Sequence, residues 1–130
     1  MIIDITNEVY TNLKTTMTSV NVLISYPSTT PSFPCITIEE ISNTTNRNTI
    51  DTNGEEYNDI SFEINIFSDN ANKITEMKTI RKQIDDIMSG QYRMTRGFSG
   101  QTPNFLDTNV YRYTLRYSCT IDSNKKIYRR

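Results

Sequence analysis

The chain has 130 residues, no histidine, and 14 basic against 15 acidic side chains, which gives a formal net charge of −1. This balance excludes an overall positive field that would attract nucleic acid or an anionic membrane. With no histidine and only two cysteines, which lack CxxC spacing, a metal site is not expected. The length fits one domain, residues 1–130, that buries roughly two thirds of the surface its unfolded form exposes.

Hydropathy and cysteine usage predict a cytoplasmic product. No apolar run approaches the roughly 20 residues that cross a bilayer, and the first residues lack the basic and apolar regions of a secretory signal. Cys35 and Cys119 both lie among apolar neighbours in expected strands. We therefore expect buried, reduced thiols rather than a disulfide.

Residues 4–18 are predicted to form an amphipathic helix. Asp4 is suited to cap its start, and Glu8 lies near the first turn, where negative charge meets the positive end of the helix dipole. The apolar side chains recur in steps of four and form one stripe, Ile5, Val9, Leu13 and Met17. The helix is therefore expected to bury one side.

A short strand is expected over residues 20–25, with Val20, Val22 and Ile24 on its buried face. Three prolines in residues 27–34 then predict a loop, because proline cannot donate to a sheet ladder.

Residues 35–41 and 57–67 are predicted to form two strands joined by a long polar connection. The second strand shows the clearest alternation in the chain, with one apolar face formed by Ile60, Phe62, Ile64 and Ile66. The connection, residues 42–56, is far longer than a usual hairpin loop. Such a length is typical of a functional or disordered segment.

A second helix is predicted to begin after a cap cluster at residues 68–70 and to end at Gly90. Its apolar side chains recur in steps of three and four, Ile74, Met77, Ile80, Ile84 and Ile87. A helix of roughly 18 residues is about 27 Å long, enough to cross several strands of a sheet.

Three further segments complete the chain. Residues 92–98 are expected to form a strand, and the glycine, proline and asparagine in residues 99–104 predict a turn. In the last strand, residues 111–121, tyrosines and other apolar side chains on one face alternate with arginine, threonine and serine on the other. The basic tail, residues 123–130, is expected to be solvated.

Together these segments predict an α+β fold, in which two helices pack on one face of a mostly antiparallel mixed sheet of about four to five strands. The polar connection, residues 42–56, is expected to extend two of the strands as a long β-hairpin. The face of the sheet away from the helices is polar. We therefore expect it to meet water or another subunit rather than a second internal core.

No segment predicts catalysis, and we expect neither an enzyme nor a bound cofactor. General acid–base chemistry near neutral pH usually draws on histidine or on carboxylates in apolar pockets. Neighbouring side chains point apart, so solvated positions are expected for the acidic pairs Glu39 and Glu40, Glu55 and Glu56, and Asp85 and Asp86. Arg112 and Arg116 share a polar face, where they are expected to pair with Glu63 or Glu39, or with an adjoining subunit, rather than to bind nucleic acid.

The order of these segments resembles the tail terminator family of long-tailed bacteriophages, together with related tail-completion proteins of phage-like particles. The resemblance covers nearly the whole chain: the opening helix, the proline-led strand of residues 33–40, the strand 57–67 with its following helix, and the arginine-tyrosine strand of residues 111–122. It implies a structural virion protein at the head-proximal end of the tail. Copies of such a protein form a ring, usually of six, that binds the tail tube protein, ends tube polymerisation and presents the surface for the neck or head.

The resemblance also implies roles for particular residues. The hairpin extension would project about 20 Å, at about 3.3 Å per residue, to contact the tube or line a channel that lets DNA pass without sticking. The candidate tube or channel contacts are Asn46, Arg47, Asp51, Asn53, Glu55 and Glu56. A closed ring needs two different surfaces on each subunit, for which the polar sheet face and its edge are the candidates. The candidate contacts between subunits are Glu63, Arg112 and Arg116.

Two alternatives stay open. A neck or head-completion joining protein of the same particle would have similar features, and it would be retained in filled heads rather than in isolated tails. A small-ligand binding module would need an apolar pocket with convergent polar groups, which no segment indicates.

Overall fold

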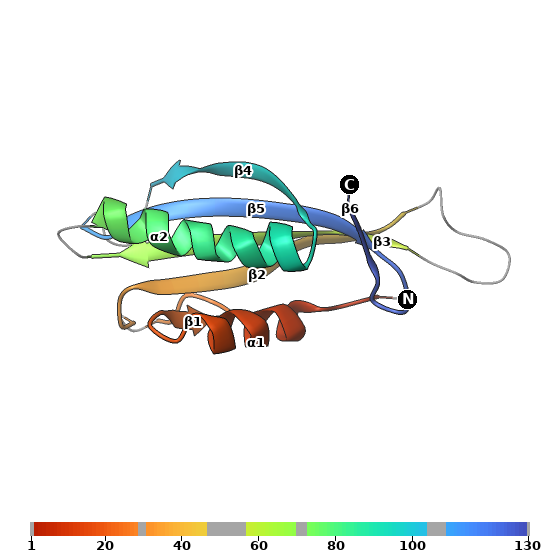
Figure 1. Cartoon of the computed structure of the whole chain (residues 1–130), viewed down its shortest axis with the longest axis horizontal. Helices are drawn as coiled ribbons and strands as arrows, with labels where there is room; N and C mark the ends of the chain where they lie inside the picture. Colours follow the sequence, from red (N-terminus) through yellow and green to blue (C-terminus); the bar gives the residue numbers. More distant parts are fainter. Residues whose placement is uncertain (1, 29–30, 47–56, 70–72, 104–108, 130) are drawn as a thin grey trace, which may run out of the picture.

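The computed structural model describes residues 2–28, 31–46, 57–69, 73–103 and 109–129. Two helices and a mixed six-stranded sheet form the predicted α+β fold (Figure 1). The elements are α1 (Thr6–Thr16), β1 (Asn21–Leu23), β2 (Cys35–Thr45), β3 (Asn58–Ser68), α2 (Lys73–Asp85), the π-helical segment η2 (Asp86–Gln91), β4 (Thr95–Thr102), β5 (Tyr111–Ile121) and β6 (Ile127–Arg129). The strands lie in the order β1-β2-β3-β5-β4, and β6 pairs with β5 beyond the end of β4.

Helix α1 runs from Thr6 to Thr16, within the predicted residues 4–18, and buries one stripe, as predicted. The Asp4 carboxylate oxygen Oδ1 accepts a hydrogen bond of 2.8 Å from the Thr6 backbone N–H. This contact satisfies one of the donors that the start of a helix leaves open, although Asp4 lies one residue before the cap position, which Ile5 occupies without a side-chain hydrogen bond. The side chains of the predicted stripe are all buried, Ile5, Val9, Leu13 and Met17.

The first strand is shorter than predicted. β1 runs parallel to β2 and pairs with it through three residues, the last pair being Leu23 and Thr37. Val20 and Val22 are buried, but Ile24 lies beyond the strand and is 47% exposed. The prediction that Ile24 faces the core is wrong, because alternation fixes the direction of a side chain only while the ladder continues.

The ladder of β2 and β3 continues past Ile41 into the polar connection, as the predicted hairpin extension requires. The ladder continues through an irregularity at Ile41 to Thr45, and the Asn46 N–H donates to the Tyr57 carbonyl oxygen at 2.6 Å. The prediction that the strand ends at Ile41 is wrong, because a bulge lets one residue leave the ladder without ending it. The base of the predicted hairpin extension is therefore present, while residues 47–56 lie outside the described residues.

Helix α2 and η2 together lie over the sheet, as Figure 1 shows. Four members of the predicted stripe are buried, Met77, Ile80, Ile84 and Ile87. The fifth, Ile74, is 54% exposed, so its assignment to the core is wrong. Ile74 is the second residue of α2, and the stripe is buried only from Met77 onward.

Two segments that were not predicted as strands form strands. Residues 99–102, predicted as a turn, belong to β4 and pair with β5 as far as Thr102 and Arg112. The tail, predicted to be solvated, contains β6, which pairs with β5 at Thr120 and Tyr128. The predicted turn is wrong, because edge strands carry glycine and charged residues more readily than central strands do. The tail is exposed at residues 123–126 and 128, as predicted, although its last described residues pair with β5. β6 also brings the strand count above the predicted four to five.

One continuous core lies between the sheet and the helices. β3 and β5 supply its centre with side chains that are fully or almost fully buried, Ile60, Phe62, Ile64, Ile66, Leu115, Tyr117, Cys119 and Ile121. Burying a side chain of this size stabilises the fold by about 1.5–3 kcal/mol. The alternation predicted for β3 and β5 is thereby confirmed.

A second, smaller apolar cluster lies on the opposite face of the sheet, at the end that carries β1. It consists of the buried residues Cys35, Phe67 and Val110, with Leu23, Tyr26 and Phe33 packed against them. The Tyr26 and Phe67 rings lie with their centroids 4.8 Å apart. The prediction that this face carries no internal core is therefore wrong at this end, because the segment after β1 folds back over it.

Candidate interaction surface

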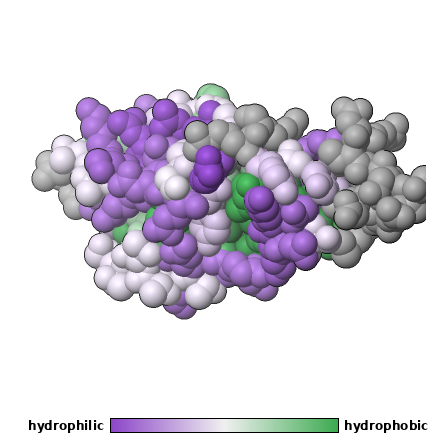
Figure 2. Space-filling model, turned by 45° about the vertical axis from the view of Figure 1, so that its right-hand side comes forward, coloured by the Kyte–Doolittle hydropathy of each residue, from purple (hydrophilic) through white to green (hydrophobic). Residues whose placement is uncertain are grey.

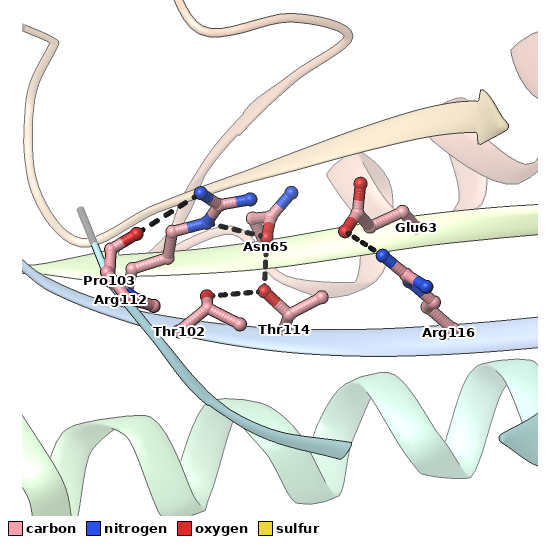
Figure 3. Close-up of polar contacts among 7 residues, drawn as sticks. All are labelled: Glu63, Asn65, Thr102, Pro103, Arg112, Thr114 and Arg116. Carbon is pink, nitrogen blue, oxygen red and sulfur yellow. Dashed lines mark hydrogen bonds and ion pairs between the residues drawn. The ribbon is translucent and has the colours of Figure 1, made fainter. Parts of the chain in front are cut away.

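The sheet face turned away from the helices carries a row of polar side chains, called here the polar face. Alternation along β3 and β5 places five of them side by side, Glu63, Asn65, Arg112, Thr114 and Arg116. Figure 3 shows these residues above the two strands. The three residues predicted as contacts between subunits, Glu63, Arg112 and Arg116, are thus brought together on one face.

Asn65 organises one half of the polar face. Its Oδ1 accepts hydrogen bonds from Arg112 Nε at 3.0 Å and from the Thr114 hydroxyl at 2.7 Å. Because the Thr114 hydroxyl donates its one hydrogen to Asn65, the Thr102 hydroxyl, 2.7 Å away, donates to Thr114. Arg112 also donates to the Pro103 carbonyl oxygen at 3.4 Å. These bonds connect β3, β5 and β4, so Arg112 stabilises the subunit itself.

The other half of the polar face contains an ion pair. Arg116 and Glu63 approach to 3.4 Å, which confirms the predicted pairing across the sheet. The Arg116 side chain is 54% exposed, so the pair contributes at most about 1 kcal/mol. The Arg116 guanidinium also lies 5.8 Å from the centre of the Phe98 ring. Glu39 lies opposite Glu63 on β2 and is exposed.

The base of the hairpin carries a further polar cluster. Asp59 Oδ1 accepts hydrogen bonds from the Thr120 hydroxyl at 2.7 Å and from the Asn46 side-chain amide at 3.3 Å. The Tyr57 and Tyr128 rings stack with their centroids 5.7 Å apart. Asn46 thus lies at the end of a strand pair that Asp59 connects to β5. The other predicted tube or channel contacts lie outside the described residues, Arg47, Asp51, Asn53, Glu55 and Glu56.

A polar cluster between η2 and the sheet was missed by the sequence reasoning. Asp85 Oδ1 accepts hydrogen bonds from the hydroxyls of Tyr117 and Ser89, each at 2.9 Å, and lies 3.4 Å from Arg96 Nη1. The prediction that Asp85 is solvated surface is therefore wrong, whereas the Asp86 side chain is 64% exposed. The available signal for a partly buried Asp85 was that it directly follows Ile84, a member of the apolar stripe.

Two groups near the core have raised pKa values. Burial, with the hydrogen bond to Asp85, raises the pKa of the Tyr117 hydroxyl far above its usual range. Burial raises the pKa of the Cys35 thiol to about 11, with a smaller effect of the nearby Asp69 carboxylate. Both groups are therefore protonated near neutral pH. Cys35 and Cys119 are buried and not joined in a disulfide, as predicted.

The surface holds a cleft of about 450 Å³ along α2. Its lining mixes small polar and apolar residues, Ser19, Val20, Pro34, Thr75, Glu76, Thr79, Ile80 and Gln83. The single charged group, Glu76, accepts a hydrogen bond from the Ser68 hydroxyl at 2.6 Å. In the view of Figure 2, apolar areas are small and separated by hydrophilic side chains. A cleft of this kind lacks the convergent polar groups of a small-ligand site.

Within the part of the chain that the structure describes, no cluster of three or more acidic or thiol side chains has an arrangement that could hold a metal ion. Among the same residues, no helix is long and apolar enough to cross a membrane.

The sequence matches no protein-family model, and no curated protein matches it. The function is therefore proposed from the polar face and the base of the hairpin.

Proposed function

We propose that the chain is the subunit of a ring that caps the tail tube of a tailed virus or a phage-like particle. The ring ends polymerisation of the tube and offers the neck or head its attachment surface. Its partners are further copies of the chain, the tail tube protein and a neck or head-completion protein. The subunit is made in the host cytoplasm, and the assembled ring lies at the head-proximal end of the tail. It works by shape, without a cofactor.

The observation that carries the proposal is the hairpin of β2 and β3. Ile60 is the last buried apolar residue of β3 toward the hairpin end, yet the ladder continues to Asn58 and its partner Thr45. The Asp59 carboxylate ties this part of the hairpin to β5. Figure 1 shows that it lies at one end of the long axis of the molecule, far from β1. A polar hairpin end that is held in place by hydrogen bonds is suited to bind a neighbouring protein by shape.

The polar face is suited to contacts between copies of the chain. A guanidinium has five N–H donors, and the Arg116 side chain is 54% exposed while it pairs with Glu63. Donors of Arg116 therefore stay available to an acceptor on another subunit. Arg112 is the weaker candidate of the two, because its bonds to Asn65 and Pro103 already use it within the subunit.

The test is to mix the purified protein with the tube protein of the same genome. Mass by light scattering and negative-stain images are then compared with those of a variant that lacks residues 46–53. The proposal predicts rings or discs at one end of each tube for the intact chain, and none for the deletion variant, which should keep its circular dichroism spectrum. Tubes that neither bind the intact chain nor change in length would overturn the proposal.

A neck or head-completion protein is the second candidate, since the hairpin end and the polar face also suit contact with a portal or head ring. Fractionation of particles separates the two. Retention of the protein in isolated tails supports the tube cap, and retention in filled heads without tails supports the neck protein.

A further inference from the structure

The base of the hairpin, residues 43–46 of β2 and 57–60 of β3, receives little support from the apolar core. Ile60 is its last buried apolar residue, and the strand pair beyond it ends with the hydrogen bond from the Asn46 N–H to the Tyr57 carbonyl oxygen. A strand pair without an apolar face is only marginally stable by itself. The direction of the hairpin therefore depends on the groups that contact its base from the two faces of the sheet.

The C-terminal segment, residues 122–128, contacts the base of the hairpin on the side of the polar face. β6 pairs with β5 at Tyr128 and Thr120, and the Thr120 hydroxyl donates to the Asp59 carboxylate at 2.7 Å. This register places Tyr128 on the same face as Tyr57, and the two rings stack with an angle of 8° between their planes. Their centroids lie 5.7 Å apart, within the range of about 4.5–7 Å at which aromatic rings attract each other.

Contacts within the C-terminal segment fix the Tyr128 ring. Asp122 accepts hydrogen bonds from the backbone N–H groups of Asn124 and Lys126, each at 2.9 Å, and from the Tyr128 hydroxyl at 3.2 Å. The Lys126 ammonium lies 5.3 Å from the centre of the Tyr128 ring, at the distance of a cation–π contact. Tyr128 is thus held in one position against Tyr57, although it is 36% exposed.

The segment before α1 contacts the base of the hairpin on the opposite face of the sheet. The Ile3 carbonyl oxygen accepts a hydrogen bond of 2.8 Å from the side-chain amide of Asn43. An ion pair between Lys125 and Glu8 joins this part of the chain to the C-terminal segment. Figure 1 shows β6 and the segment before α1 near the place where the hairpin leaves the sheet. The base of the hairpin is therefore held between two segments that are connected to each other.

We infer that the C-terminal segment is a strap that fixes the direction of the hairpin, and that Tyr128 is its positioning residue. Tyr128 is not part of the apolar core, so loss of its ring frees the hairpin without unfolding the sheet. A binding element that is already ordered loses less conformational freedom when it meets a partner, which strengthens binding. The strap itself does not depend on the tube-cap proposal, whereas its effect on binding of the tube protein rests on that proposal.

Amide hydrogen exchange of the full chain, followed by NMR, tests the strap without any partner. The Asn46 N–H reports on the base of the hairpin, because it is bonded across the strand pair. The amides of Ile64 and Leu115, which pair with each other in the middle of the sheet, are the internal reference. Tyr128→Ala removes the ring, and Tyr128→Phe keeps it. Phe98→Ala is the matched control, since Phe98 is an aromatic residue on the edge strand β4 that is 48% exposed.

Tyr128→Ala is expected to speed exchange of the Asn46 N–H about three- to tenfold, while exchange of the two reference amides changes less than about twofold. In Tyr128→Phe and Phe98→Ala, the Asn46 N–H should stay within about twofold of the wild-type rate. An unchanged Asn46 rate in Tyr128→Ala would overturn the inference. Equal acceleration of all three amides would overturn it too, because that result reports a loss of overall stability. A wild-type Asn46 N–H that exchanges as fast as in an unfolded chain would show that the hairpin is not held.

Co-sedimentation with tubes of the tube protein tests the effect of the strap on binding. Tyr128→Ala should bind tubes about three- to tenfold more weakly than the wild type, and Tyr128→Phe should bind like the wild type. Equal binding by Tyr128→Ala and the wild type would overturn the role of the strap in binding. If the wild type does not bind tubes at all, the proposed function fails, and the exchange rates still decide whether the strap holds the hairpin.

Discussion

Replacing Asp85 with alanine is expected to lower the free energy of unfolding by about 2–3 kcal/mol. The carboxylate accepts hydrogen bonds from Tyr117 and Ser89 at 2.9 Å and lies 3.4 Å from Arg96. The largest part of the loss comes from Tyr117, which is 1% exposed, because a buried hydroxyl without an acceptor costs about 1–3 kcal/mol. The Arg96 side chain is 46% exposed, so its ion pair adds at most about 1 kcal/mol.

A double-mutant cycle with Tyr117→Phe isolates this hydrogen bond. Once Tyr117 lacks its hydroxyl, removal of Asp85 no longer leaves a buried donor without an acceptor. The loss caused by Asp85→Ala should therefore shrink by about 1–2 kcal/mol in the Phe background. Urea unfolding followed by circular dichroism measures all four proteins, provided that their denaturant slopes agree. Losses that add within about 0.5 kcal/mol would refute the account of Asp85 as the acceptor of Tyr117.

Three further predictions concern the core, the pH dependence and the polar face. Ile64→Ala, at a fully buried site, is expected to lower the free energy of unfolding by about 2–5 kcal/mol, whereas Ile74→Ala should change it by less than about 0.5 kcal/mol in the same urea assay. The hydrogen bond from Lys125 lowers the pKa of Glu8. Its stabilising effect is present above the pKa of an unfolded glutamate and is lost as the pH falls through the lower pKa of the folded state. Glu8→Gln should therefore lower the urea midpoint at about pH 7 and leave it unchanged at about pH 2, and an equal effect at both would contradict this. Arg116→Glu should keep the protein folded, at a cost of about 1–2 kcal/mol because the new carboxylate also lies opposite Glu63, but weaken association of copies in sedimentation velocity. Unchanged association would remove Arg116 from the contact.

The parts of the fold that were predictable are those in which burial repeats with the period of the backbone. The alternation of β3 and β5 and the stripe of α1 were confirmed, because one buried face imposes a period that can be read from the sequence. Ile74 has the same spacing as the buried residues of α2 and yet is 54% exposed. Periodicity gives the direction of a side chain on its helix, but it does not give where the helix leaves the sheet.

The missed strands and contacts depend on neighbours that are distant in the sequence. β6 is a strand because Ile127 pairs with Ile121 across a turn, and β4 continues past the predicted end of its strand because residues 99–102 pair with β5 as far as Arg112. Neither segment is apolar enough to be recognised by itself. The pairing of Arg116 with Glu63 was predictable, since it needs only two opposite charges on neighbouring strands. The role of Asn65 as the acceptor of two hydrogen bonds was not predictable, because it depends on the register of β3 against β5.

The most direct test of the proposed function is the length of tubes that the tube protein forms with and without this chain. The proposed function predicts that tubes polymerised freely have a broad range of lengths. The chain, added during polymerisation, should shorten the mean length as its concentration rises, and tubes that are already capped should stop growing when more tube protein is added. If tubes bind the chain and still elongate at both ends, or if their lengths do not depend on it, the chain is not a tube cap.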